Sequence, residues 1–280
     1  MGGSGIRIYI SCDMEGVAGI VDWRQVVAGA EQGEGQRLLL AEVNAAIDGA
    51  ETMGATSFLV NDSHGAMRNL PPDQIHGEAE YCSGQHKPLY MMEGLDEDFD
   101  ACFFIGYHGA VDGAASVLSH TYSPAAIQGA TLNGHLVGES GINTLVASHF
   151  RVPVALISGD QHTAAQAESI LRGAEMVVVK QSLTRLAARS LHPAVARRRI
   201  HDGAISALAR LSEIPPPTLS APFRLEVRLR NADLVQVAIQ VRGVRPVSEL
   251  SVLVEGDDAL AVYRSFVGLL QITRGLGQGR

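Results

Sequence analysis

Short apolar runs alternate along the chain with longer segments whose apolar residues recur at helical spacing. The first run, Ile6 to Ser11, is rich in β-branched residues and predicts a strand. From about Glu34 to Met53 the apolar positions follow a helical period, and Gly54 comes next, where a helix end favours a left-handed residue. Thr56 to Val60 predicts a second strand. A strand, a helix and a strand in this order predict a right-handed parallel crossover.

The same order repeats further along the chain. Ala101 to Gly106 is an unbroken apolar run, as expected for a strand of a parallel sheet that is covered on both faces. We therefore expect an α/β fold with a mostly parallel sheet flanked by helices. The remaining segments that the pattern predicts are a helix over 141–150, a strand over 154–158, a helix over 162–171, a strand over 176–180, helices over 183–211 broken near Pro193, a strand over 223–229 and a helix over 259–272.

The clearest linker is a run of three prolines, Pro215 to Pro217. It predicts an α/β domain over residues 1–214 and a smaller C-terminal α/β subdomain over residues 218–280. The segment from Met1 to Gly5 resembles a leftover of cloning, and we expect it to lie outside the fold.

Composition and charge exclude several classes of protein. Hydrophobic residues make up 46% of the 280 residues and charged residues 19%, which is typical of a globular protein. The formal net charge of −8 argues against a nucleic-acid partner. Because the chain has neither a long apolar run nor a leader-like start, we expect no membrane span and no secretory leader. The three cysteines form no CxxC pair, so we expect no disulfide framework, no cysteine zinc site and a reducing cytoplasm.

Candidate chemistry gathers at the ends of the predicted strands. Asp13 and Glu15 follow the first strand, His64 follows the second, and His108 follows the strand that begins at Ala101. Ligands of open α/β sheets bind outside the carboxyl ends of the strands, so we expect these side chains to converge. Two further segments add a carboxylate before a predicted helix and a histidine in a polar stretch, at Glu139 and His120.

The donor set favours a catalytic metal site. Carboxylates with imidazoles and without thiolates suit zinc or a similar divalent ion in an open site. Two histidines and three carboxylates exceed what one tetrahedral ion uses, whereas two ions bridged by one carboxylate would use them all. Such a pair lowers the pKa of a shared water enough to make hydroxide near neutral pH.

Each of these residues also has a simpler interpretation when it is taken alone. A carboxylate in a turn or in the first turn of a helix can act as a cap, which applies to Asp13, Glu15 and Glu139. A histidine can bond to a backbone group or lie satisfied in the core, which applies to His64, His108 and His120. We expect Asp160 and His162 to serve a helix start, and we expect Cys12 to be buried on the opposite side of its strand from Asp13. The chain has no P-loop, no GxGxxG after a strand and no G-x-S-x-G elbow.

Five motifs in a fixed order carry a family resemblance. They are SCDMEG at 11–16, NDSHG at 61–65, GYH at 106–108, SHT at 119–121, and the segment from Asn133 to Asn143 with GESG at its centre. The set resembles the zinc-dependent D-aminopeptidases of the bacterial dipeptide-operon type, over nearly the whole chain up to the triple proline. The resemblance implies two zinc ions with Asp13 as the bridging ligand and His120 as the catalytic histidine. The implied ligands are Asp13, Glu15, His64, His108 and Glu139.

The resemblance also implies an activity and an assembly. Members of the family release the N-terminal residue of short peptides, prefer D-amino acids, and form a ring-like decamer. We therefore expect residues 1–214 to form a metal-binding catalytic domain of a dinuclear zinc aminopeptidase. Two rivals are a metal-dependent amidase for a small non-peptide amide, and a non-catalytic module that holds a metal for structural reasons.

Overall fold

The larger layer of the molecule is a seven-stranded sheet with the strand order β3-β2-β1-β4-β7-β8-β9. In this computed structural model, which describes residues 5–276, all neighbouring strands are parallel except β8 and β9. Only Gly5 of the expected cloning leftover lies inside the described residues. The strands are β1 (Ile6–Cys12), β2 (Ala55–Asp62), β3 (Glu80–Cys82), β4 (Ala101–Ile105), β7 (Val154–Asp160), β8 (Glu175–Thr184) and β9 (Ala187–Ser190).

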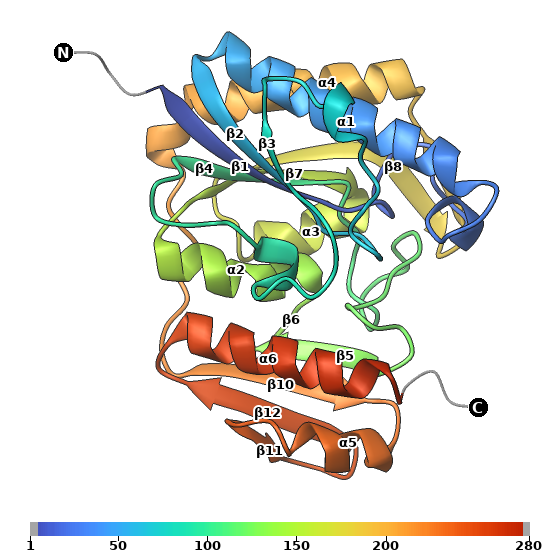
Figure 1. The fold of residues 1–280 in the computed structure, drawn as a ribbon, viewed down its shortest axis with the longest axis vertical. Helices are drawn as coiled ribbons and strands as arrows, with labels where there is room; N and C mark the ends of the chain where they lie inside the picture. Colours follow the sequence, from blue (N-terminus) through green and yellow to red (C-terminus); the bar gives the residue numbers. More distant parts are fainter. Residues whose placement is uncertain (1–4, 277–280) are drawn as a thin grey trace.

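Helices cover both faces of this sheet (Figure 1). Two long helices, α1 (Gln32–Thr52) and α4 (Pro193–Ala209), pack against each other on one face, and α2 (Glu139–Phe150) and α3 (Gln161–Glu168) lie on the other. Ile8, Ile10 and Phe103 point into the core beneath α1 and α4. Because both faces are buried, the central strands are apolar at nearly every position, as the sequence pattern predicted.

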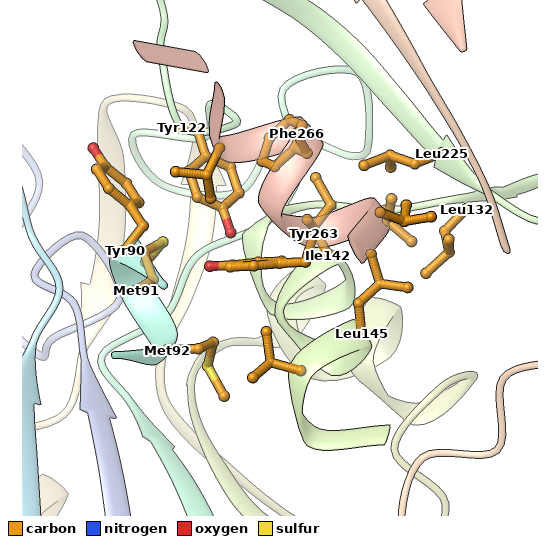
Figure 2. Close-up of a cluster of buried hydrophobic side chains, with 14 of the residues drawn as sticks. Tyr90, Met91, Met92, Tyr122, Leu132, Ile142, Leu145, Leu225, Tyr263 and Phe266 are labelled. Atoms are coloured by element: carbon orange, nitrogen blue, oxygen red, sulfur yellow. The ribbon is translucent and has the colours of Figure 1, made fainter. Parts of the chain in front are cut away.

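A second sheet lies beyond α2 and is antiparallel throughout, in the order β11-β12-β10-β5-β6. Alternate residues of β10 are buried, as expected for a sheet with one covered face. The helix α6 lies between this sheet and α2, and residues of both helices and of the second sheet share one core (Figures 1 and 2). The elements are β5 (Ile127–Leu132), β6 (His135–Leu136), β10 (Phe223–Leu229), α5 (Ala232–Ala238), β11 (Val244–Pro246), β12 (Ser251–Gly256) and α6 (Ala259–Arg274).

The predicted fold class is confirmed, with two differences in detail. Residues 183–192 are not helical, since β8 runs to Thr184 and returns as β9, which pairs with it antiparallel. Leu183 and Leu186 are 68% and 61% exposed at the tip of this hairpin. The second sheet also takes β5 and β6 from within residues 1–214, so the C-terminal segment does not complete it alone.

The topology brings three strand ends together. From β1 the chain crosses to β2 on one side and later places β4 on the other side, so the order reverses at β1. The register sets Cys12 opposite both Asp62 and Ile105, which brings the residues after these three strands to the same level. Within residues 5–276, none of the helices combines the length and the hydropathy that a membrane span requires.

Candidate metal centre

Five predicted side chains meet at this edge of the sheet, and all five are buried. The imidazole Nδ1 of His64 lies 3.0 Å from Oδ1 of Asp13 and 3.1 Å from Oε2 of Glu15. The Nε2 atom of His108 lies 3.4 Å from Oδ2 of Asp13 and 3.5 Å from Oε1 of Glu139. Asp13 therefore faces both histidines, one with each carboxylate oxygen.

Two glycines let the loops that follow β1 and β4 approach closely enough to build this cluster. The backbone N–H of Gly16 donates to the carbonyl of Gly106 at 2.8 Å, and a Cβ atom on Gly16 would lie 1.9 Å from the carbonyl oxygen of Tyr107. Gly106 has a φ of +73°, and a Cβ there would lie 2.2 Å from the carbonyl oxygen of Asp13. Side chains at either glycine would push Asp13 away from His108.

Each histidine at the site is oriented by a backbone carbonyl. A carbonyl only accepts hydrogen bonds, so the ring nitrogen beside it carries the proton. The protonated atoms are Nε2 of His64, 2.7 Å from the carbonyl of Val26, and Nδ1 of His108, 2.9 Å from the carbonyl of Gly109. The other nitrogen of each ring then has a free lone pair directed at the carboxylates. This is the arrangement by which proteins fix the tautomer of a metal-binding histidine.

His120 lies beside this cluster on a separate loop. Its ring stacks on that of His108, with the centroids 4.3 Å apart, and its Nε2 atom lies 3.4 Å from Oε1 of Glu139. Its Nδ1 atom lies 3.0 Å from the carbonyl of Leu118, which leaves Nε2 as the free acceptor of the neutral ring. Trp23 packs edge-on against the imidazole.

The loop that carries His120 is held in place by Asp160. One carboxylate oxygen of Asp160 accepts hydrogen bonds from the backbone N–H groups of His162 and Thr163 at the start of α3. The other accepts from the hydroxyl of Ser116 and the N–H of Val117. The expected helix-start role of Asp160 is confirmed, and the same side chain also anchors the loop two residues before Ser119. The residues on either side of the Ser119–Thr121 segment, Leu118 and Tyr122, have φ values of +51° and +56°.

The charges of the cluster call for a cation. Asp13, Glu15 and Glu139 form no ion pair with a lysine or arginine among residues 5–276. Oδ2 of Asp13, both carboxylate oxygens of Glu15 and Nε2 of His108 are buried without a hydrogen-bond partner. Buried polar atoms are normally satisfied, so four such atoms within one cluster of carboxylates and imidazoles fit the donors of a metal site.

The electrostatics of the imidazoles lead to the same conclusion. Burial alone would lower the pKa of His108, but the nearby carboxylate of Glu139 raises that pKa to about 10. Burial also disfavours the charged form of His64, but the carboxylate of Glu15 outweighs this effect and raises the pKa of His64. The pKa of His120 is lowered to about 4 by burial and by the neighbouring His108. Positive charge is thus favoured between the carboxylates and disfavoured at His120.

The donors fall into groups that suit metal ions. Asp13, Glu15 and His64 form one group whose ligand atoms lie within 4.8 Å of one another, and Asp13, His108 and Glu139 form a second. The two groups share only Asp13. A third possible group joins Glu15, His108 and His120. Oxygen and imidazole donors without thiolates suit zinc in a catalytic site.

A cavity of about 310 Å³ opens onto this cluster. Asp13, Glu15, His64, His120 and Glu139 contribute to its wall. The volume lies at the lower end of the range for small-ligand sites. The cavity therefore suits a small molecule rather than a folded chain.

The comparisons with known proteins now bear on this centre. The sequence profile described as D-aminopeptidase matches residues 6–267. The chain belongs to the D-aminopeptidase family. It is 32% identical over 271 residues to a D-aminopeptidase of Bacillus subtilis (strain 168), which covers 95% of this chain and 97% of that protein. It is also similar to the structure of the Zn-dependent D-aminopeptidase DppA from Bacillus subtilis, described as a self-compartmentalizing protease, with a TM-score of 0.91, 30% identity, and coverage of 98% and 99% of the two chains.

The resemblance seen in the five motifs is therefore confirmed, and the protein is a metal-dependent hydrolase of the D-aminopeptidase family. Membership does not favour the amidase or the structural metal module. Cys12 is buried in the core on the α1 side, as expected. Asp62 shares a motif with His64, but its carboxylate is occupied by other partners. It accepts hydrogen bonds from Asn69, Leu70 and Tyr81.

One buried residue of this D-aminopeptidase has a role that the sequence analysis did not assign. The Nζ atom of Lys180 donates to the backbone carbonyls of Glu15, Val17 and Ile20 and so fixes the loop that carries Glu15. A lysine directly after an apolar run of a strand was the available signal, because lysine is rarely buried without partners.

Proposed function

We propose that this protein is a dinuclear zinc D-aminopeptidase that releases the N-terminal D-amino acid from short peptides. The observation that carries the proposal is the pair of donor groups that share only Asp13. In this assignment Asp13 would be shared by two ions, with Glu15 and His64 in the first group and His108 and Glu139 in the second. The D-configuration of the substrate follows the names of both relatives.

The residues present fit the metal, because the buried atoms without partners are its preferred oxygen and nitrogen donors. A bound zinc pair supplies Lewis-acid polarisation of the scissile carbonyl and lowers the pKa of water. The chain itself supplies orientation. The carbonyls of Val26 and Gly109 hold His64 and His108, Lys180 holds the Glu15 loop, and the backbone N–H of Tyr122 donates to Oε1 of Glu139 at 2.6 Å.

His120 is the proposed proton carrier. Its Nδ1–H is fixed by the carbonyl of Leu118, so Nε2 of the neutral ring would accept the proton that the attacking water loses and pass it on at once to the leaving amine. The third donor group contains His120 and would make it a ligand instead. We favour the catalytic role because five other donors already complete two groups.

The remaining proposals concern assembly and compartment. We propose a homo-oligomer, specifically a ring-like decamer, because the DppA relative is described as self-compartmentalizing. We propose a cytoplasmic location because the three cysteines are free, as expected in a reducing compartment.

Three dipeptide substrates test the function. The zinc-loaded protein should hydrolyse D-Ala-D-Ala, act far more slowly on L-Ala-L-Ala, and leave N-acetyl-D-Ala-D-Ala intact because it lacks the free amine. The Asp13→Ala variant is the inactive control. Equal hydrolysis of the acetylated peptide would favour the amidase, and zinc binding without hydrolysis of any substrate would favour the non-catalytic module.

A further inference from the structure

The cavity at the metal centre has one basic side chain of the lysine or arginine type among the described residues that line it, Arg274. This arginine lies in the last turn of α6, a helix that packs against α2 and the second sheet. The cavity therefore has an acidic cluster in one part of its wall and a guanidinium in another. A short peptide has the matching pair of charges, an amine at one end and a carboxylate at the other.

A tyrosine holds the guanidinium in this position. Nη1 of Arg274 donates to the hydroxyl oxygen of Tyr90 at 3.0 Å. Tyr90 is 5% exposed, and Figure 2 shows its hydroxyl directed away from the other labelled side chains of the core. Within residues 5–276 no carboxylate pairs with Arg274, and its bond to Tyr90 uses one of the five N–H donors of the guanidinium. Guanidinium groups bind carboxylates with two parallel hydrogen bonds.

A short series of contacts connects Arg274 with the metal centre. The ring of Tyr90 lies 5.8 Å from the ring of Tyr122, centroid to centroid, and the backbone N–H of Tyr122 donates to Glu139. All four residues line the same cavity. A peptide of two or three residues spans roughly 7–11 Å when extended. The 5.8 Å between the two tyrosine rings is one part of the path along which such a peptide would lie.

We propose that Arg274 binds the C-terminal carboxylate of the substrate and makes the enzyme selective for peptides of two or three residues with a free carboxylate. This inference rests on the proposed function and adds the chemistry of the other end of the substrate. Arg274 is a specificity residue in this account, since the scissile bond lies at the metal centre.

The competing interpretation is structural. A cation in the last turn of a helix interacts favourably with the helix dipole, and Arg274 also contacts Tyr90 in the core wall. A structural role would affect every substrate alike. A carboxylate-binding role would affect only substrates that carry the carboxylate.

The test compares two substrates that differ in that group alone, D-Ala-D-Ala and D-Ala-D-Ala amide, with the zinc-loaded full-length enzyme. We expect the kcat/KM of wild type to be about 10- to 100-fold higher for the free acid than for the amide, which is the effect of one charge-assisted hydrogen bond. The difference should lie mainly in KM. Arg274→Met should abolish this preference. It should leave kcat/KM for the amide within about 2-fold of wild type, because the amide has no carboxylate for Arg274 to bind. Arg274→Lys should fall between the two.

The matched control is Arg264→Met, which removes an exposed arginine from the same helix and should behave as wild type. Zinc content is measured for each variant. Wild type that cleaves both substrates equally well would overturn the inference and leave the proposed function standing. An equal loss on both substrates in Arg274→Met and Arg274→Lys would show a structural role and would also overturn it. Wild type that cleaves neither substrate would refute the proposed function, and this inference with it.

Discussion

At the scale of the residue, the centre depends on which atom of each side chain faces inward. The sequence placed Asp13, His64 and His108 after strand ends, and the structure brings them together there. The sequence could not show which ring nitrogen is free, because the carbonyls that fix it belong to Val26 and Gly109 and act only in the folded chain. The role of Lys180 was not assigned for a similar reason, since its three carbonyl partners lie more than 150 residues away along the chain.

His120 gives the first residue-scale prediction. The His120→Ala variant should keep its zinc and its melting temperature but lose about 10²- to 10⁴-fold in kcat, the usual contribution of a general acid or base. KM should change little, because the group acts in the transition state. Steady-state kinetics and metal analysis check this, with His201→Ala, at a half-buried histidine of α4, as the control. Loss of one zinc ion with His120 would make it a ligand instead.

Glu42 gives a prediction about pH. Its Oε1 atom accepts a hydrogen bond from the N–H of Ala18, its Oε2 atom is buried without a partner, and burial raises its pKa to about 7. The folded protein therefore binds a proton at Glu42 that the unfolded chain releases at lower pH. The stability that this proton provides is complete below the unfolded pKa of about 4.5 and is lost as the pH rises to about 7.

The Glu42→Gln variant should remove this dependence while keeping the bond to Ala18. Between pH 5 and pH 8, the free energy of unfolding of wild type should fall by about 2–4 kcal/mol more than that of the Glu42→Gln variant. Urea unfolding of both proteins at the two pH values measures the difference, and contributions from other groups cancel between them. Identical pH profiles would show that Glu42 is ionised throughout this range.

At the scale of the element, the sequence pattern predicted features that depend on neighbouring residues, such as the end of a helix. The helix α1 ends at Thr52, and Gly54, two residues later, has the left-handed φ of +88° that the glycine indicated. The strand predicted over 176–180 is part of β8, but residues 183–192 were predicted as helix and are not. This segment forms a hairpin because β9 pairs with β8, and the spacing of its own residues does not show that pairing. The strand β5 gave no local signal, since it forms by pairing with β10 nearly 100 residues later. Non-local pairing of this kind overrides intrinsic preference.

The cap of α3 links an element to the site. The Asp160→Ala variant should lose about 1 kcal/mol of stability from the cap. It should also lose about 10- to 100-fold in kcat with zinc retained, because the loop of His120 loses its anchor. Asn231→Ala removes the N-cap of α5, away from the site, and should cost similar stability without affecting kcat. Equal kinetic losses in the two variants would contradict the anchoring role.

At the scale of the whole molecule, we expect assembly to restrict the substrate. Light scattering should give a mass ten times that of one chain if the protein forms the proposed ring. Leu183 and Leu186, exposed at the tip of the β8–β9 hairpin, are candidates for contact between copies. Changing both to Ser should leave the fold intact and lower the mass if the hairpin is such a contact. A wild-type mass equal to one chain would contradict the ring.

The dinuclear centre is tested most directly by the anomalous scattering of crystals of the zinc-loaded protein at the zinc edge. We expect two peaks per chain roughly 3.5–4 Å apart, as in other two-metal sites. One carboxylate oxygen of Asp13 should lie against each peak, with His64 at one and His108 at the other. A single peak, or two peaks that do not share Asp13, would contradict the dinuclear centre.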